Sequence, residues 1–156
     1  MPATRETGFL PDLDALDPAT LARTAIMYLC SPANPQGTVA SAAYLEQAIQ
    51  LARHHDFILA LDECYSEIYS ETPPTGGAEI CQKIGGRMKN VLVFHSLSKR
   101  SSEPGLRSGF VAGDPDLIQR FKLLRNFGGA TMPMPVMAAS SALWRDESHV
   151  EVNHAL

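Results

Sequence analysis

The sequence predicts an α/β fold with a mostly parallel sheet, and three observations support this class. Four apolar runs of strand length lie along the chain, at residues 24–30, 57–61, 91–94 and 109–113. Segments with the apolar spacing of helices lie between and after these runs. The runs are continuously apolar instead of alternating, which is typical of strands covered on both faces. The length of 156 residues is that of one domain.

Composition narrows the class of protein. An apolar share of 45% and a charged share of 19% are typical of a soluble globular chain. The net charge of −4 comes without a basic block, which argues against nucleic acid or a membrane surface as a partner. No apolar run reaches membrane-spanning length, and residues 1–6 carry no signal-peptide core, so the sequence favours a cytoplasmic protein.

Thiols and imidazoles show no disulfide or metal pattern. Cys30, Cys64 and Cys81 are odd in number and include no C-x-x-C pair, which favours reduced thiols. The histidines do not have the spacing of metal ligands, so no metal site is predicted. His95 is interpreted as a structural histidine that makes hydrogen bonds.

The first third of the chain predicts a strand followed by a helix. Residues 1–23 are mostly polar and are expected to form a surface lead-in with a short helix. The run 24–30 is the first strand, and the two prolines and the glycine that follow it end regular structure. Ser41 is an N-cap for a helix that ends at residues 54–56. The apolar face of this helix is formed by Tyr44, Leu45, Ala48, Ile49 and Ala52.

The middle of the chain predicts three more strands. The strand at 57–61 ends in two acidic residues, and a short helix is expected at 78–84. The strand at 91–94 leads into residues 99–105, whose composition predicts a loop. The strand at 109–113 follows after this loop alone. Because a parallel return needs a longer crossover, this last strand is expected to run antiparallel to a neighbour.

Two helices are predicted after the last strand. Asp114 is an N-cap and Pro115 the first helical residue of a helix that reaches about Arg125. A segment rich in alanine, serine and methionine, beginning at residue 133, predicts a second helix up to Trp144. A polar tail with two histidines follows.

Distinctive polar residues follow three of the predicted strands. Asn34 follows the first strand, Asp62 and Tyr65 the second, and Ser96 and Lys99 the third. Because ligands of open α/β sheets bind at the carboxyl ends of the strands, these side chains are expected to share one edge. A lysine at the mouth of a buried strand, with hydroxyls before it and an arginine after it, indicates an anionic ligand held beside an amine nucleophile. A solvated lysine at a strand end is the alternative.

Two kinds of nucleotide site are weak alternatives. The acidic pair Asp62-Glu63 after an apolar strand is also typical of nucleotide-hydrolysing enzymes, but the sequence has no G-x-x-x-x-G-K-[ST] loop. A dinucleotide fold needs G-x-G-x-x-G after its first strand, where residues 31–37 read SPANPQG.

Three motifs together resemble the class I and II aminotransferases, which are fold-type I enzymes dependent on pyridoxal phosphate. They are Asn34-Pro35-x-Gly37, Asp62-x-x-Tyr65, and Ser96-x-Ser98-Lys99 with Arg107 eight residues later. The segment 98–110 is most similar to succinyldiaminopimelate aminotransferases of lysine biosynthesis. The resemblance implies part of the large cofactor-binding domain, with a mostly parallel sheet, flanking helices and one antiparallel strand.

The resemblance implies catalytic roles for Lys99, Asp62 and Tyr65. Lys99 would bond to the cofactor aldehyde and move a proton between substrate and cofactor, which requires an amine that is neutral part of the time. Asp62 would pair with the pyridine nitrogen and keep it protonated. Tyr65 and Asn34 would hydrogen-bond the ring hydroxyl oxygen.

The resemblance also implies a phosphate site. Arg107 would bind the cofactor phosphate with a bidentate contact, and Ser96 and Ser98 would donate their hydroxyls. Arg100 has no implied role. It is interpreted as a surface cation, with a contact to an acidic substrate as the alternative.

The resemblance covers residues 1–156 as a single partial domain, well under half of a usual family member. Residues 1–23 are the lead-in, and residues 133–156 begin the helix towards a small domain. The aromatic that stacks on the cofactor and the arginine that binds the substrate carboxylate are not found in the sequence. The 156-residue chain alone is therefore expected to have little or no transaminase activity, and to expose a sheet edge and apolar helix faces.

The implied function is amino transfer between an amino acid and a 2-oxo acid. Glutamate and 2-oxoglutarate are the expected pair, and the parent enzyme is expected to be a homodimer. Two alternatives remain open. One is another reaction on the same cofactor, such as C–S lysis, and the other is a non-catalytic module that binds pyridoxal phosphate.

Overall fold

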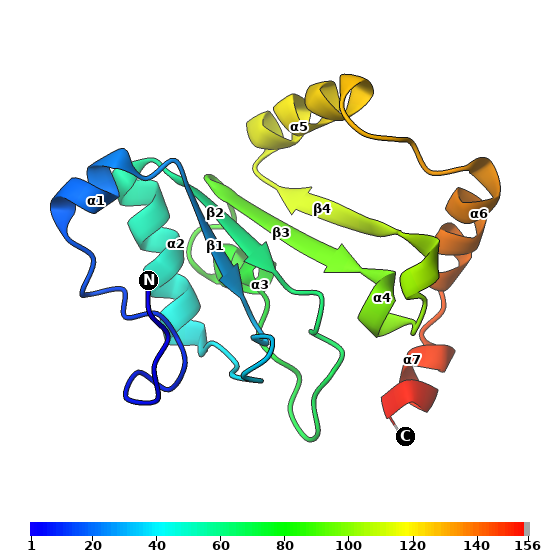
Figure 1. The fold of residues 1–156 in the computed structure, drawn as a ribbon, viewed down its shortest axis with the longest axis horizontal. Coiled ribbons are helices and arrows are strands. Elements are labelled where there is room, and N and C mark those ends of the chain that lie inside the picture. Colours follow the sequence, from blue (N-terminus) through cyan, green and yellow to red (C-terminus); the bar gives the residue numbers. More distant parts are fainter. Residues whose placement is uncertain (155–156) are drawn as a thin grey trace.

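The computed structural model describes residues 1–154, which form a four-stranded sheet surrounded by helices (Figure 1). The strands lie in the order β1-β2-β3-β4; the first three are parallel, and β4 is antiparallel to β3. Their bounds are Ile26–Cys30 for β1, Ile58–Asp62 for β2, Val91–Ser96 for β3 and Gly109–Gly113 for β4. The predicted class and the predicted antiparallel strand are confirmed.

Helices connect the strands and continue the chain after β4. They are α1 (Pro18–Arg23), α2 (Ala42–His55), α3 (Gly77–Lys83), α4 (Leu97–Arg100), α5 (Pro115–Phe127), α6 (Met134–Leu143) and α7 (Ser148–His154), with a 3₁₀ turn, η1, at Pro104–Leu106. The predicted N-cap of α2 is confirmed, because the hydroxyl of Ser41 accepts a hydrogen bond from the Tyr44 N–H at 3.2 Å. Within residues 1–154, no helix has both the length and the apolar character needed to cross a membrane.

The core lies between one face of the sheet and helices α2 and α3. In β1, Met27 and Leu29 are buried and belong to this core, whereas Tyr28 is 73% exposed. The expectation that each strand is covered on both faces is therefore wrong for β1, which contributes only one face to the core, and for β4, in which no residue is buried. The buried apolar residues of the neighbouring elements are Leu45, Ala48, Ile49, Ala52, Leu59, Leu61, Ile80, Cys81, Val91 and Val93.

The lead-in of residues 1–23 is more than a surface segment. Its Leu13 and Leu21 are buried in the core. The hydroxyl of Tyr44, on α2, donates a hydrogen bond to the Pro11 carbonyl at 2.7 Å. The expectation of a purely surface lead-in is wrong because its two leucines cover apolar surface next to α2, which stabilises the fold by removing that surface from water.

The segment 99–105, which was expected to be a loop, begins within a helix. Lys99 lies on α4, a single helical turn that begins where the Ser96 hydroxyl accepts a hydrogen bond from the Ser98 N–H at 3.1 Å. The predicted helix from residue 133 to Trp144 is confirmed as α6, but the polar tail after it forms α7. The last two residues of the predicted segment 133–156 lie outside the described residues.

The sheet topology gathers three connections at one edge. Because β1, β2 and β3 are parallel, their carboxyl ends meet there. The antiparallel β4 starts at the same edge, where Gly109 pairs with Ser96. The segments that follow β1 and β2 and the segment that joins β3 to β4 therefore converge (Figure 1).

Candidate active site

Three predicted site residues from three separate segments of the chain meet at this edge. The side-chain amide of Asn34 donates a hydrogen bond to the hydroxyl oxygen of Tyr65 at 2.7 Å. The Nζ atom of Lys99 lies 5.5 Å from the centre of the Tyr65 ring, which is a cation–π geometry. Tyr65 is half-buried, while Asn34 and Lys99 are exposed. The arrangement places an amide beside a phenol and an amine over the phenol ring.

Two neighbouring acids at the end of β2 have different surroundings. Asp62 is exposed, and its carboxylate accepts a hydrogen bond from the Cys64 N–H at 3.1 Å. Glu63 is buried; its carboxylate accepts from the Gly77 N–H at 2.6 Å and lies 3.1 Å from Nε2 of His95. Asp62 is thus the acid that faces the edge, and Glu63 is used for folding.

The thiols near Asp62 stay neutral at ordinary pH. Burial raises the pKa of Cys64 to about 12, and the hydrogen bond and negative charge of Asp62 act in the same direction. Burial also raises the pKa of Cys30, which lies beside Asp62 in the strand register. Because a thiolate is the reactive form of cysteine, these thiols do not supply a nucleophile here.

The two predicted serines form a second group at the start of α4. The hydroxyl oxygens of Ser96 and Ser98 are 2.9 Å apart. Arg107 precedes β4 in a left-handed conformation, with φ of 52°, and its guanidinium donates to the Pro104 carbonyl at 2.9 Å. Within residues 1–154, no side-chain hydrogen bond or ion pair joins Asp62 or Arg107 to the other predicted site residues. The roles assigned to these residues remain predictions.

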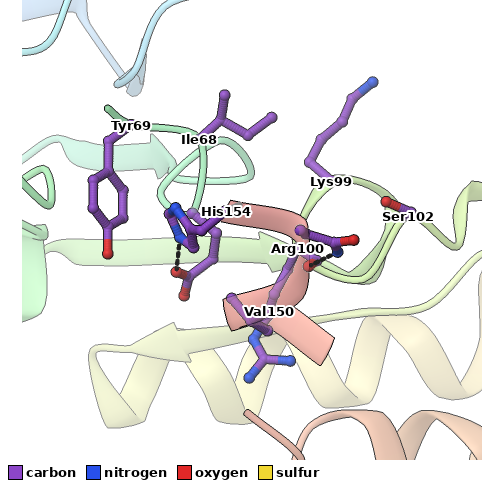
Figure 2. A pocket seen from close by; sticks show the side chains of 9 residues that line it. Ile68, Tyr69, Lys99, Arg100, Ser102, Val150 and His154 are labelled. Carbon is purple, nitrogen blue, oxygen red and sulfur yellow. Dashed lines mark hydrogen bonds and ion pairs between the residues drawn. The ribbon is translucent and has the colours of Figure 1, made fainter. Parts of the chain in front are cut away.

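A cavity of about 320 Å³ lies beside Lys99 (Figure 2). Some of the residues that line it were not predicted from the sequence as site residues. The ring centres of His154, on α7, and Tyr69 are 4.3 Å apart. Nε2 of His154 lies 3.7 Å from the carboxylate of Glu67. Glu67 and Tyr69 follow Tyr65 without any motif, and His154 was expected in a polar tail. The segment between β2 and α3 places Glu67 and Tyr69 at this cavity, and the folding of α7 beside α4 places His154 there.

Arg100 is not the surface cation that was expected. It is only 8% exposed. Its guanidinium donates to the Leu143 carbonyl at 3.0 Å and to the Glu147 carboxylate at 2.5 Å, and lies 5.3 Å from the Trp144 ring. These partners follow Arg100 by 43 to 47 positions, so no local sequence pattern predicts the contacts.

His95 has the structural role that was expected. Besides its contact with Glu63, its ring stacks on that of Phe110 with centres 5.0 Å apart. The two residues are register partners across β3 and β4. His95 therefore joins the antiparallel strand to the buried acid and is not directed at a ligand.

Comparisons with known proteins agree with this architecture. The sequence profile of the family "Aminotransferase class I and II" matches residues 1–155. Among curated relatives, 4-dedimethylamino-4-oxo-anhydrotetracycline transaminase OxyQ of Streptomyces rimosus is 39% identical over 128 residues, which are 81% of this chain and 35% of that protein. The chain spans about a third of the length of the curated relatives it matches.

Solved aminotransferase structures share the fold. Aminotransferase AspB from Helicobacter pylori superposes with a TM-score of 0.92 at 46% identity, covering 99% of this chain and 41% of that one. A probable N-succinyldiaminopimelate aminotransferase from Thermus thermophilus superposes with a TM-score of 0.83 at 26% identity, covering 94% of this chain and 39% of that one. These neighbours are fold-type I enzymes, which confirms the predicted fold type. The chain belongs to the class I and II aminotransferase family.

Proposed function

We propose that this chain forms the cofactor-binding part of a transaminase that moves an amino group between an amino acid and a 2-oxo acid. Members of the family use pyridoxal phosphate. The observation that carries the proposal is the cluster at the strand ends, where Lys99 lies over Tyr65 and Tyr65 accepts a hydrogen bond from Asn34. A lysine solvated by chance at a strand end does not require this arrangement.

Each predicted site residue carries a chemical group of the kind that one part of pyridoxal phosphate would require. Lys99 supplies a primary amine for an aldehyde, and the exposed carboxylate of Asp62 suits a protonated pyridine nitrogen. The hydrogen-bonded pair of Asn34 and Tyr65 suits the ring hydroxyl oxygen. The guanidinium of Arg107, with two serine hydroxyls at the start of α4, suits a phosphate.

Each of these side chains has a distinct task in amino transfer. When bound, the cofactor supplies an electron sink for the electron pair of the substrate α-carbon. Lys99 would move the proton between that carbon and the cofactor carbon, so its amine must be neutral for part of the cycle. Asp62 holds the proton on the pyridine nitrogen. Arg107 carries the positive charge that holds the phosphate in place.

We further propose N-succinyldiaminopimelate as the substrate of the whole protein. The similarity of residues 98–110 to that group of enzymes and the likeness to the Thermus thermophilus structure support it. The similarity to the Streptomyces rimosus transaminase shows that related sequences serve other substrates. Glutamate and 2-oxoglutarate would be the second pair, in a homodimeric enzyme.

Cofactor attachment can be tested on the 156-residue chain. Incubation with pyridoxal phosphate, reduction with borohydride and peptide mass spectrometry are expected to find the pyridoxyl group on Lys99. Lys99→Ala should abolish this modification and the accompanying absorbance band near the visible, because the covalent partner is gone. Lys83→Ala, which removes an exposed lysine of α3, is the control and should change neither. Modification spread evenly over surface lysines would contradict the proposal.

The substrate requires the whole protein. We expect kcat/KM for N-succinyldiaminopimelate with 2-oxoglutarate to exceed that for diaminopimelate by about tenfold or more, since a site built for a polar group loses its partners without it. Release of homocysteine, pyruvate and ammonia from cystathionine, without transfer of the amino group to 2-oxoglutarate, would indicate a C–S lyase. Attachment of the cofactor without either reaction would indicate a binding module.

A further inference from the structure

The helix that carries Lys99 cannot hold its own position. Helix α4 has four residues, and helices of one turn are unstable without tertiary contacts. Within residues 1–154, Nζ of Lys99 has no recorded hydrogen bond or ion pair, only its position over the Tyr65 ring. The location of the amine therefore depends on what fixes the backbone of α4.

The first half of α4 is fixed by the sheet. Ser96, the last residue of β3, caps the helix, and Leu97 is fully buried. The Leu97 N–H also donates to the Ser108 carbonyl at 3.1 Å, which ties the turn to the segment before β4. These contacts hold the entry to α4 but not its exit.

The second half is fixed by a distant segment, residues 143–153. Besides the contacts of Arg100 with Leu143 and Glu147, its guanidinium lies 3.4 Å from the Asp146 carbonyl. The side chain of Asn153 donates to the Arg100 carbonyl at 3.3 Å. Both the side chain and the backbone of Arg100 are thus held.

The residue after Arg100 is held by the same segment. Nε2 of His149 lies 2.8 Å from the Ser101 hydroxyl, and its Nδ1 lies 2.9 Å from the Asp146 carboxylate. Ser101 is buried and closes α4, since its N–H bonds to the Leu97 carbonyl at 3.0 Å. We call Leu143, Asp146, Glu147, His149 and Asn153 the α4 brace.

Lys99 and Arg100 have different roles: Lys99 faces Tyr65 at the candidate site, and Arg100 binds the α4 brace. Figure 2 shows their side chains leaving α4 in opposite directions, with the Arg100 guanidinium towards α7. We propose that Arg100 is a positioning residue: by joining α4 to the α4 brace, it fixes where the Lys99 amine lies relative to Tyr65. This inference rests on the proposed role of Lys99 in holding the cofactor.

Arg100 should matter more than its ion-pair partner. The Glu147 side chain is 68% exposed, whereas that of Arg100 is 9% exposed. Replacing Glu147 leaves Arg100 bonded to two backbone carbonyls. Replacing Arg100 removes all three contacts, so Arg100→Ala is expected to loosen α4 more than Glu147→Gln does.

The test uses the 156-residue chain with two measurements. Hydrogen exchange of the cofactor-free chain reports the order of residues 97–103, and borohydride trapping of pyridoxal phosphate reports the reactivity of Lys99. For Arg100→Ala we expect exchange in 97–103 to be about tenfold faster, with residues 42–55 of α2 unchanged. We expect the trapped fraction at Lys99 to fall about threefold or more, because the amine is less well placed.

Matched variants separate positioning from general stability. Arg125→Ala removes an arginine that donates to two backbone carbonyls at the end of α5, and should change neither measurement. Arg100→Lys keeps the charge with fewer donors and should restore both measurements in part. If Arg100→Ala does not fold, Ser101→Ala, which removes only the His149 contact, must still accelerate exchange in 97–103.

The outcomes distinguish this inference from the proposed function. Unchanged exchange in Arg100→Ala would refute the α4 brace. Faster exchange with an unchanged trapped fraction at Lys99 would make the contacts structural only and refute the positioning role. If Lys99 is not trapped in the unmodified chain, the proposed function fails, and the exchange measurement alone decides whether Arg100 orders α4.

Discussion

Lys99 and Arg100 are neighbours in the sequence, yet their side chains lie in opposite surroundings. Lys99 is exposed at the strand-end edge, while Arg100 is buried against the α6–α7 turn. A helical turn rotates successive residues by about 100°, so one residue can face the site and the next the protein. A buried guanidinium must be paired and hydrogen-bonded, and Arg100 has both kinds of partner.

The contact between Asn34 and Tyr65 allows a sharp test of the site. In Asn34→Ala and in Tyr65→Phe, we expect affinity for pyridoxal phosphate to fall about three- to tenfold, the value of one hydrogen bond. Titration followed by absorbance measures this. The loss of binding free energy in the double variant should be smaller than the sum of the two single losses, because each single change already breaks the hydrogen bond between Asn34 and Tyr65.

The matched control for that test is Tyr28→Phe, which removes the hydroxyl of a tyrosine that is 73% exposed on β1. It should leave the affinity unchanged. Strictly additive losses in the double variant would show that the two side chains act on the cofactor separately.

At the scale of elements, helix caps fix where α2 and α5 begin. The carboxylate of Asp114 accepts from the Asp116 N–H at 2.9 Å at the start of α5, and also from the Asn90 N–H at 2.8 Å. It thus joins α5 to the turn before β3. Among residues 1–154, the Ser41 hydroxyl accepts a hydrogen bond only from the N–H of Tyr44.

Asp114→Ala is therefore expected to be more destabilising than Ser41→Ala. We expect the free energy of unfolding to fall by about 2 kcal/mol for Asp114→Ala, because a cap is lost and the Asn90 N–H loses its acceptor. Ser41→Ala, the control, should cost about 1 kcal/mol. Urea unfolding followed by circular dichroism measures both, and equal losses would contradict the double role of Asp114.

Asp114 also gives the stability a dependence on pH. Burial raises the pKa of Asp114, but the N–H groups of Asn90, Asp116 and Leu117 and the charge of Lys89 outweigh it, so the folded pKa lies below its usual range. Its stabilising effect is complete above the unfolded pKa of about 3.9 and is lost as pH falls through the folded value. The free energy of unfolding of the unmodified chain should therefore approach that of Asp114→Asn as the pH falls from 6 to 3.

At the scale of the molecule, the expected exposure of apolar helix faces is confirmed. Phe127 is 88% exposed, Met134 79% and Leu124 66%, all on α5 and α6. Tyr28 and Ile26 are exposed on β1, an edge strand. Exposed apolar surface of this kind marks sites of contact with other protein surface.

This surface predicts strong binding of an apolar dye. In the double variant Leu124→Gln, Phe127→Gln we expect the fluorescence of bound anilinonaphthalene sulfonate to fall roughly twofold, because apolar surface is removed. The midpoint of thermal unfolding should not fall, since neither side chain belongs to the core. Lys122→Gln on the same helix is the control and should change neither value; a loss of stability in the double variant would show that these residues pack in solution.

Local patterns in the sequence determined the four strands, most helices and the order of the motifs. Apolar runs, the cap residues Ser41 and Asp114 and the prolines act on neighbours a few positions away, so their effects can be predicted from the sequence. The antiparallel direction of β4 followed from the shortness of its connection. The strand-end position of Lys99 followed from the apolar run before it.

Tertiary structure alone decided which side chains are buried and which contacts they make. The burial of Arg100 depends on residues more than 40 positions later, and the separation of Asp62 from Glu63 depends on the position of α3 and on His95. The role of the lead-in was likewise decided by contact of Leu13 with the core. Contacts between residues far apart in sequence form only when the chain is folded, because no local spacing encodes which distant surfaces will meet.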